Sequence, residues 1–332
     1  MRENIFKSHI MFSFRNAVVG AILFVTFSHC SVCRADLLYV VSTGTNVIEK
    51  FTLDGVGTSF SDTGLNIPTG LAFDGAGNLY TANTGNFTIQ KYTPLGLGSM
   101  FVQLSAMCYD VAFDKDGNLY TAGYSDNKIY KVSPGGVVSI FSTSGLLQGP
   151  TSLAFDSAGN LYVGNWNNNT IVKLTPEGSG SLFAYTGSYP SDLAFDRDGN
   201  LYVSNWGSNN IQKFTTAGMG SVFGSTGLSN PGAIAFDSVG NLYVANSGLA
   251  TIEKFTPEGV ASVFANTGMN NQTGMAFTDD AGNPLIAVPE PAIWALLGIS
   301  LPVWIGLARR RRKTRLVCLR AFGPPSRESV YF

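Results

Sequence analysis

A ten-residue motif recurs along the chain and restricts the folds that the chain can adopt. It reads LAFDGAGNLY at residues 71–80, and further copies begin at residues 111, 153, 193 and 234, with a degraded copy from Met275. The phenylalanine of each copy follows the previous one after 40 to 42 residues. A period of about 40 residues, with strand-forming side chains and frequent turns, is typical of β-propellers.

Each repeat unit reads as four strands. The motif supplies the first two, Leu-Ala-Phe-Asp and Asn-Leu-Tyr-Val, which a Gly-Asn turn joins. A polar loop then leads to a third strand, such as 170–175, and a Pro-Glu-Gly turn leads to a fourth, such as 181–184. Asp and Ser open such turns by bonding the backbone, and Gly supplies positive φ.

The number of units predicts six blades. Five units are complete, and the two ends of the repeat region supply the sixth: residues 38–41, 47–51 and 58–60 give strands two to four, and the copy from Met275 gives strand one. We therefore predict an all-β fold, a six-bladed β-propeller over residues 36–287. Each blade has four antiparallel strands, and strands from both ends close the ring.

The net charge of −1 hides an acidic central region. Residues 36–287 hold nine basic and 19 acidic residues, which gives a charge of about −10, while basic residues gather towards both ends of the chain. Binding to nucleic acid depends on neutralising phosphates with Lys and Arg. The propeller is therefore not expected to bind nucleic acid.

Histidine and cysteine restrict the chemistry further. Both histidines, His9 and His29, precede position 36. A Ser-His-Asp triad, a Cys-His pair and a His-ligated zinc site are thus excluded from the predicted propeller. Cys108 is its single cysteine, so no disulfide can form within it, and we expect a small buried apolar side chain there.

Residues 1–35 are typical of a secretory signal peptide. Basic residues precede an apolar stretch at 17–27, and small residues at Cys33 and Ala35 fit a cleavage site before Asp36. The segment predicts export, with an uncleaved N-terminal anchor as the alternative.

The C-terminal segment combines three features in order. An apolar stretch at 292–308, long enough for one transmembrane helix, lies between two short motifs, Val288-Pro289-Glu290-Pro291 and Arg309-Arg310-Arg311-Arg312-Lys313. Residues 288–313 resemble the PEP-CTERM sorting signal of bacteria. The resemblance implies recognition by an exosortase at the inner membrane, removal of the tail, and delivery to the cell surface or extracellular matrix. A plain membrane anchor is the alternative, and residues 314–332 form an extra tail of unknown role.

The repeat itself resembles the NHL family of propellers, and more loosely the gluconolactonase-like and streptogramin-lyase-like six-bladed families. The resemblance covers the whole of 36–287 and implies the fold, whereas propellers host unrelated activities. We expect the phenylalanine and tyrosine of each motif copy to pack within and between blades, and the aspartate to cap its turn.

Function is expected where the repeats differ. In a propeller, the loops between strands two and three and those between strand four and the next blade gather at one face around the channel. The predicted binding residues on this face are Trp166, Trp206, Asn165, Asn205, Asn246, Asn83, Tyr109, Tyr189, Asp110 and Asp192. Aromatic faces with amide and acidic groups suit a glycan, and a protein partner is also possible. The alternative is that both tryptophans merely fill the loop layer.

These observations favour an exported, envelope-sorted, non-catalytic binding or scaffold protein without a cofactor. The alternative is a gluconolactonase-like hydrolase, for which the resemblance implies a divalent metal such as Ca²⁺ on Glu, Asn and Asp. The glutamates at 49, 177, 253 and 258 lie on third strands or in the following turns, so none is expected at the channel. A streptogramin-lyase-like mechanism would need histidine. The sequence does not identify the ligand.

Overall fold

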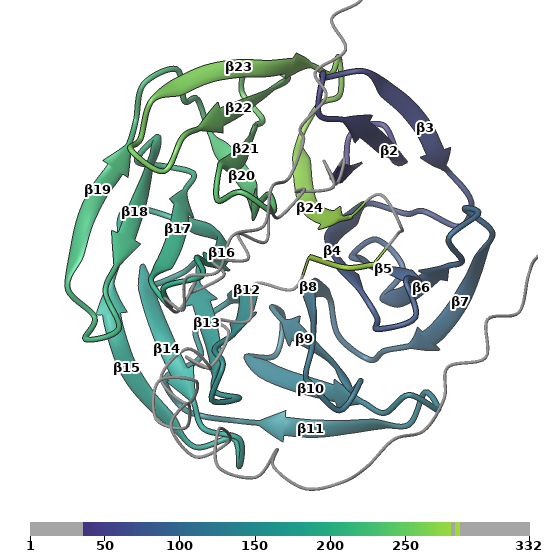
Figure 1. Ribbon diagram of the computed structural model, residues 1–332. Coiled ribbons are helices and arrows are strands. Elements are labelled where there is room, and N and C mark those ends of the chain that lie inside the picture. Colours follow the sequence, from purple (N-terminus) through teal and green to yellow (C-terminus); the bar gives the residue numbers. More distant parts are fainter. Residues whose placement is uncertain (1–35, 280–282, 286–332) are drawn as a thin grey trace, which may run out of the picture.

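The computed structural model describes residues 36–279 and 283–285 and consists of six four-stranded antiparallel sheets around a central axis (Figure 1). The predicted all-β propeller is confirmed. The predicted signal peptide, sorting signal and transmembrane segment lie outside the described residues. Within the described part of the chain, no helix has the length and apolarity needed to cross a membrane.

The blades share one strand order, from the axis outwards. The innermost strands are β4 (Pro68–Phe73), β8 (Cys108–Phe113), β12 (Pro150–Phe155), β16 (Pro190–Phe195), β20 (Pro231–Phe236) and β24 (Gln272–Thr278). The second strands are β5 (Leu79–Asn83), β9 (Leu119–Gly123), β13 (Leu161–Asn165), β17 (Leu201–Asn205), β21 (Leu242–Asn246) and β1 (Leu37–Ser42). The third strands are β6 (Thr88–Tyr92), β10 (Lys128–Val132), β14 (Thr170–Leu174), β18 (Asn210–Phe214), β22 (Thr251–Phe255) and β2 (Val47–Thr52). The outermost are β7 (Gly98–Gln103), β11 (Val138–Ser142), β15 (Gly180–Tyr185), β19 (Gly220–Gly224), β23 (Ala261–Asn266) and β3 (Gly57–Ser61).

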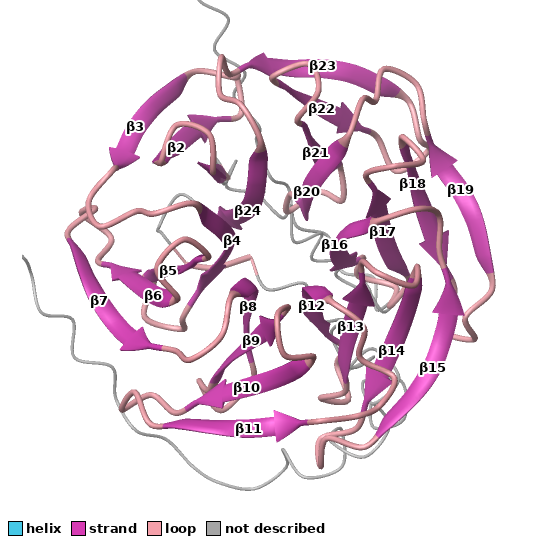
Figure 2. Cartoon of the chain, turned by 180° about the vertical axis from the view of Figure 1, so that it is seen from behind, coloured by secondary structure: helices cyan, strands magenta, loops and turns pink. Residues whose placement is uncertain are grey.

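Strands from the two ends of the repeat region close the ring. The sixth sheet has the order β24-β1-β2-β3, and β1 pairs with β24 from Leu37 opposite Thr278 to Val41 opposite Gly274. Figure 2 shows this blade beside β4 from the other side of the molecule. The contact is tight, because a Cβ on Gly274 would lie 2.7 Å from the carbonyl carbon of Gly70. Closure by both ends was therefore predicted correctly.

The aromatic residues of the motif join neighbouring blades. Tyr162 packs edge to face against Phe183 of its own blade, with ring centroids 4.9 Å apart, and against Phe195 of the next blade, at 5.0 Å. Equivalent trios occur at the other blade boundaries. Such pairs add to the burial of apolar area. The expectation of inter-blade packing is confirmed.

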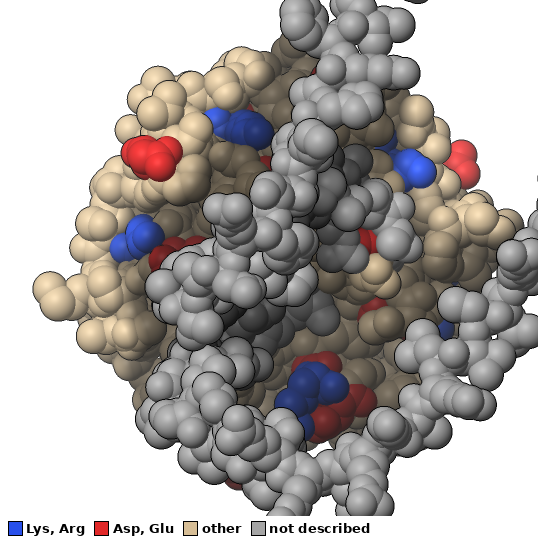
Figure 3. Space-filling view, in the orientation of Figure 1, with Lys and Arg blue, Asp and Glu red and all other residues tan. Residues whose placement is uncertain are grey.

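The motif aspartate caps its turn and also binds a lysine. Asp156 Oδ1 accepts hydrogen bonds from the backbone N–H groups of Ala158 and Asn160, at 2.9 and 2.8 Å. Lys173 Nζ lies 3.4 Å from Asp156 Oδ2 and 5.1 Å from the centroid of the Tyr162 ring. On the face in Figure 3, basic side chains lie beside acidic ones. Lys91, Lys131 and Lys213 of the equivalent third strands pair with their motif aspartates in the same way.

Candidate functional site

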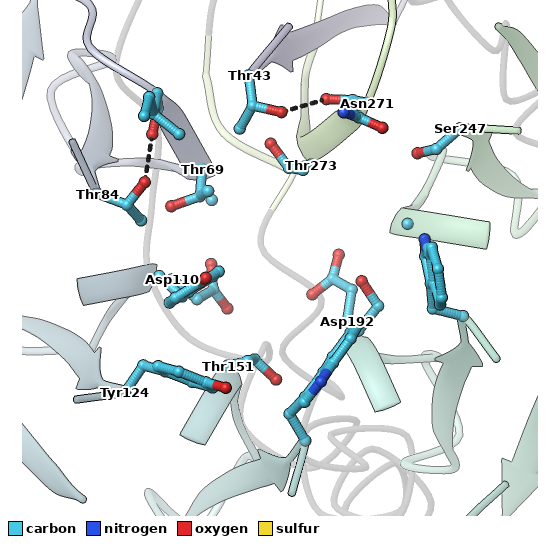
Figure 4. Close-up of a pocket in the computed structure, with 17 residues that line it drawn as sticks. Thr43, Thr69, Thr84, Asp110, Tyr124, Thr151, Asp192, Ser247, Asn271 and Thr273 are labelled. Atoms are coloured by element: carbon cyan, nitrogen blue, oxygen red, sulfur yellow. Dashed lines mark hydrogen bonds between the residues drawn. The ribbon is translucent and has the colours of Figure 1, made fainter. Parts of the chain in front are cut away.

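A cavity of about 420 Å³ lies where the innermost strands of all six blades meet (Figure 4). Two sets of loops build its rim. Within a blade, the loop after the second strand is hydrogen-bonded to the segment just before the innermost strand. The Trp166 N–H donates to the Gly149 carbonyl and the Trp206 N–H to the Tyr189 carbonyl, both at 2.9 Å. The predicted meeting of these loops is found.

Aromatic side chains form one wall of the cavity, on the three blades whose innermost strands are β8, β12 and β16. Tyr109 and Tyr124 lie with ring centroids 5.0 Å apart. Trp166 lies 5.9 Å from Trp206 and stacks at 4.9 Å on Tyr189, which is outside the cavity lining. Trp206 is 38% exposed, so ring surface remains available at the rim.

Hydroxyl groups line the opposite wall, from the blades whose innermost strands are β20, β24 and β4 (Figure 4). Thr151 and Ser191 add two hydroxyl groups on the aromatic side. Thr84 Oγ1 donates to the Ile67 carbonyl at 2.8 Å, and Thr273 Oγ1 donates to the Pro68 carbonyl at 3.1 Å. Each oxygen keeps acceptor capacity for a ligand. Sequence reasoning missed this wall. Its signal lay in two innermost strands, where Thr69 and Thr273 stand two positions before the Leu or Met that begins the motif.

Asp110 and Asp192 lie at equivalent positions of two innermost strands, each beside a register shift in its blade. Asp110 accepts the N–H groups of Val111 and, in the next blade, Leu153, both at 2.8 Å. Asp192 likewise accepts from Leu193 at 2.7 Å and, in the next blade, Ile234 at 2.8 Å. Each carboxyl group thus connects two blades and still contacts the cavity.

The two acids hold their protons more strongly than ordinary aspartates. Burial raises the pKa of Asp110 to about 7, against the opposing effect of its two backbone hydrogen bonds. Burial, followed by the charge of Asp110, raises the pKa of Asp192 well above its usual value. No Lys, Arg or His lines the cavity, and no ion pair between described residues involves either acid.

The four predicted asparagines lie elsewhere. They are fully or almost fully buried and hold the loop framework instead of lining the cavity: Asn83, Asn165, Asn205 and Asn246. Asn165, for example, accepts from the Gln148 N–H at 3.0 Å and donates to the Leu146 carbonyl at 2.9 Å. Asparagine ends four of the six second strands, β5, β13, β17 and β21, and this recurrence reflects the structural role.

The residues present do not fit the divalent metal of a gluconolactonase-like hydrolase. The described residues contain no group of three or more His, Cys, Asp or Glu that could hold a metal ion. Glu49 and Glu253 lie on β2 and β22, away from the cavity. Cys108 is buried, as expected, and burial raises the pKa of its thiol to about 12.

Comparison with known proteins places the chain in a family. The model described as the virginiamycin B lyase family matches residues 65–282, more than half of the chain. The chain belongs to the virginiamycin B lyase family. No curated protein matches this family member.

Solved structures share the fold of this virginiamycin B lyase family member. A chain from a nidogen–laminin complex is 18% identical, with a TM-score of 0.66, covering 73% of this chain and 98% of that one. A catalytically inactive His-to-Ala virginiamycin B lyase from Staphylococcus aureus, with quinupristin, is 17% identical, with a TM-score of 0.58, covering 75% and 93%. The calcium-binding protein regucalcin from Agrobacterium tumefaciens is 16% identical, with a TM-score of 0.54, covering 62% and 76%. At these identities the likeness concerns the fold alone.

Proposed function

We propose that this protein is an exported, envelope-sorted propeller that binds a ring-bearing polar ligand, such as a glycan, in its central cavity without catalysing a reaction. The observation that carries the proposal is the division of the cavity into an aromatic wall and a hydroxyl wall. Sugar rings present an apolar face that stacks on aromatic side chains, and hydroxyl groups at their edges exchange hydrogen bonds with protein hydroxyls.

The composition of the propeller supports a binding role over a lyase role. The S. aureus lyase structure with quinupristin is a catalytically inactive variant in which a histidine is replaced by alanine. This chain has no histidine after His29, so a mechanism that uses histidine has no counterpart in its propeller. The cavity instead offers tyrosines, hydroxyl groups and two acids that are themselves held by backbone N–H groups.

Binding to a panel of bacterial polysaccharides tests the proposal. The purified full chain is titrated calorimetrically beside a variant that carries both Trp166→Ala and Trp206→Ala. Tyr185→Ala is the matched control, because Tyr185 is 72% exposed on the outermost strand β15. Stacking contributes about 1 kcal/mol per ring, so we expect affinity to fall at least tenfold in the double variant and not in the control. Unchanged binding in a folded double variant would refute the cavity as the site.

The two ends of the sequence support export and sorting. The leader at 1–35 predicts translocation, and 288–313 predicts processing by an exosortase-type enzyme from an inner-membrane intermediate. Replacing Pro289, Glu290 and Pro291 by alanine is expected to leave an unprocessed, membrane-retained chain on fractionated immunoblots. Normal release of that variant would overturn the sorting proposal.

A further inference from the structure

We propose that the central cavity binds the organic ammonium group of its ligand, between the aromatic wall and the carboxyl groups of Asp110 and Asp192. The inference rests on the proposed function, because it takes the same cavity as the binding site and adds the charge of the ligand. The ligand class is a sugar or other polar molecule that carries an amine or a quaternary ammonium group.

The first observation is an acidic centre without a counter-charge. Figure 4 shows Asp110 and Asp192 among the labelled cavity side chains. Every carboxyl oxygen of the pair accepts one backbone N–H, which leaves acceptor capacity at each oxygen. The innermost and second strands of all six blades contain no Lys, Arg or His. Among the described residues of these strands nothing balances the two acids, and a cationic ligand would supply a positive charge at this level of the channel.

The second observation is that this protein holds its own lysine ammonium groups between a tyrosine ring and an aspartate. Lys213 Nζ lies 4.9 Å from the centroid of the Tyr202 ring and 3.2 Å from Asp196 Oδ2. The arrangement of ammonium, tyrosine and aspartate recurs in four blades, at Lys91, Lys131, Lys173 and Lys213. The cavity brings together the same kinds of side chain, aromatic rings and aspartates, and no lysine lines it.

The third observation is the composition of the aromatic wall. Tryptophan is the most favourable partner for a cation over a ring face, and tyrosine follows. Trp166, Trp206, Tyr109 and Tyr124 all line the cavity that contains the two acids. Their ring stacking leaves Trp206 partly exposed, so that an entering group can reach it. Aromatic rings with nearby carboxylates are typical of quaternary ammonium recognition.

Proton release follows from this arrangement. A bound cation favours the charged form of both acids, so binding below or near neutral pH must displace protons from them. The other titratable groups in the cavity lining are the phenols of Tyr109 and Tyr124, and burial raises the pKa of Tyr109 above its ordinary value. The neighbouring strands β4, β12, β20 and β24 contribute no charged residue. Affinity should therefore rise with pH.

Choline and its uncharged isostere 3,3-dimethyl-1-butanol form the decisive pair of probes, because choline keeps its charge at every pH. Both are titrated into the full chain by calorimetry at about pH 6 and about pH 8, in buffers that differ in ionisation enthalpy. We expect choline to bind about tenfold more tightly than the alcohol, more tightly at the higher pH, and with proton release at the lower pH.

Variants separate charge from shape. Asp110→Ser with Asp192→Ser should remove the preference for choline, and Asp116→Ser, at an exposed carboxyl, should keep it. Equal binding of choline and the alcohol to the wild type would overturn the ammonium inference and leave the cavity as a site for uncharged ligands. Binding of glycans alone, with no response to choline, would overturn it in the same way. Should the double variant fail to fold, proton release in the wild type decides the question.

Discussion

Asp110 gives the propeller a pH dependence of stability that can be worked out from the structure. The folded pKa of about 7 lies above the ordinary value of 3.8, so the folded state retains a proton that the unfolded chain releases over that interval. The stabilisation is therefore complete below about pH 4 and disappears as the pH rises through 7. Each pH unit in this interval corresponds to about 1.4 kcal/mol, so the titration of Asp110 alone lowers the stability by about 3 kcal/mol between about pH 4.5 and pH 8, and the raised pKa of Asp192 adds to this loss.

Asp110→Ser is the appropriate perturbation, because the equivalent position of the next blade holds Ser152. At low pH the variant should be less stable than the wild type, since the Val111 and Leu153 N–H groups lose their acceptor. Near pH 8 this deficit should shrink or reverse, because the wild type then carries a buried charge.

Urea unfolding of both proteins across this pH range, at constant ionic strength, measures the difference. Acids such as Asp74 and Asp114, whose pKa values hydrogen bonds lower, change stability only below the range. Parallel curves of unfolding free energy against pH for wild type and variant would refute the reasoning.

Three further outcomes follow from local geometry. Gly274→Ala should lower the unfolding free energy by about 1–3 kcal/mol in urea titrations, because the added Cβ would meet backbone atoms. Gly145→Ala should have little effect, because nothing lies within 4 Å of its added Cβ. Equal effects of the two substitutions would contradict the tight closure. Asp156→Ala should lower the unfolding free energy by about 2 kcal/mol, because its turn and lysine contacts are lost, whereas Asp116→Ala should leave it nearly unchanged. Similar melting temperatures of the two variants would argue against the capping role. Cys108 should resist alkylation at pH 8 until the protein is unfolded, as followed by peptide mass spectrometry, and rapid native labelling would contradict its burial.

The sequence was sufficient for the architecture because each repeat carries its own strand and turn signals. The spacing of the motif phenylalanines determined the number of blades, and the unmatched strands at both ends could only complete one another, as the pairing of Leu38 with Phe277 confirms. Propeller geometry then determined which loops share a face. The structure brings four residues of that face, Trp166, Trp206, Asp110 and Asp192, together at one cavity.

Residue type alone did not predict which side chains of that face line the cavity. Asn165 and its equivalents resemble ligand-binding amides in sequence, but their position at the end of a second strand turns them into loop anchors. The raised pKa values of Asp110 and Asp192 depend on burial and on the approach of two blades that are not adjacent in the ring, which no local pattern records. The hydroxyl wall was missed because threonine is common in strands.

The blade that closes the ring builds part of the cavity rim from residues at both ends of the repeat region. Thr43 Oγ1 donates to the Asn271 carbonyl at 3.0 Å, across a separation of 228 residues, and both residues line the cavity. β24 is the innermost strand of this blade, so a chain that lacks it cannot form this part of the rim. A chain interrupted before β24 would therefore lack one side of the cavity rim, and with it the proposed ligand site.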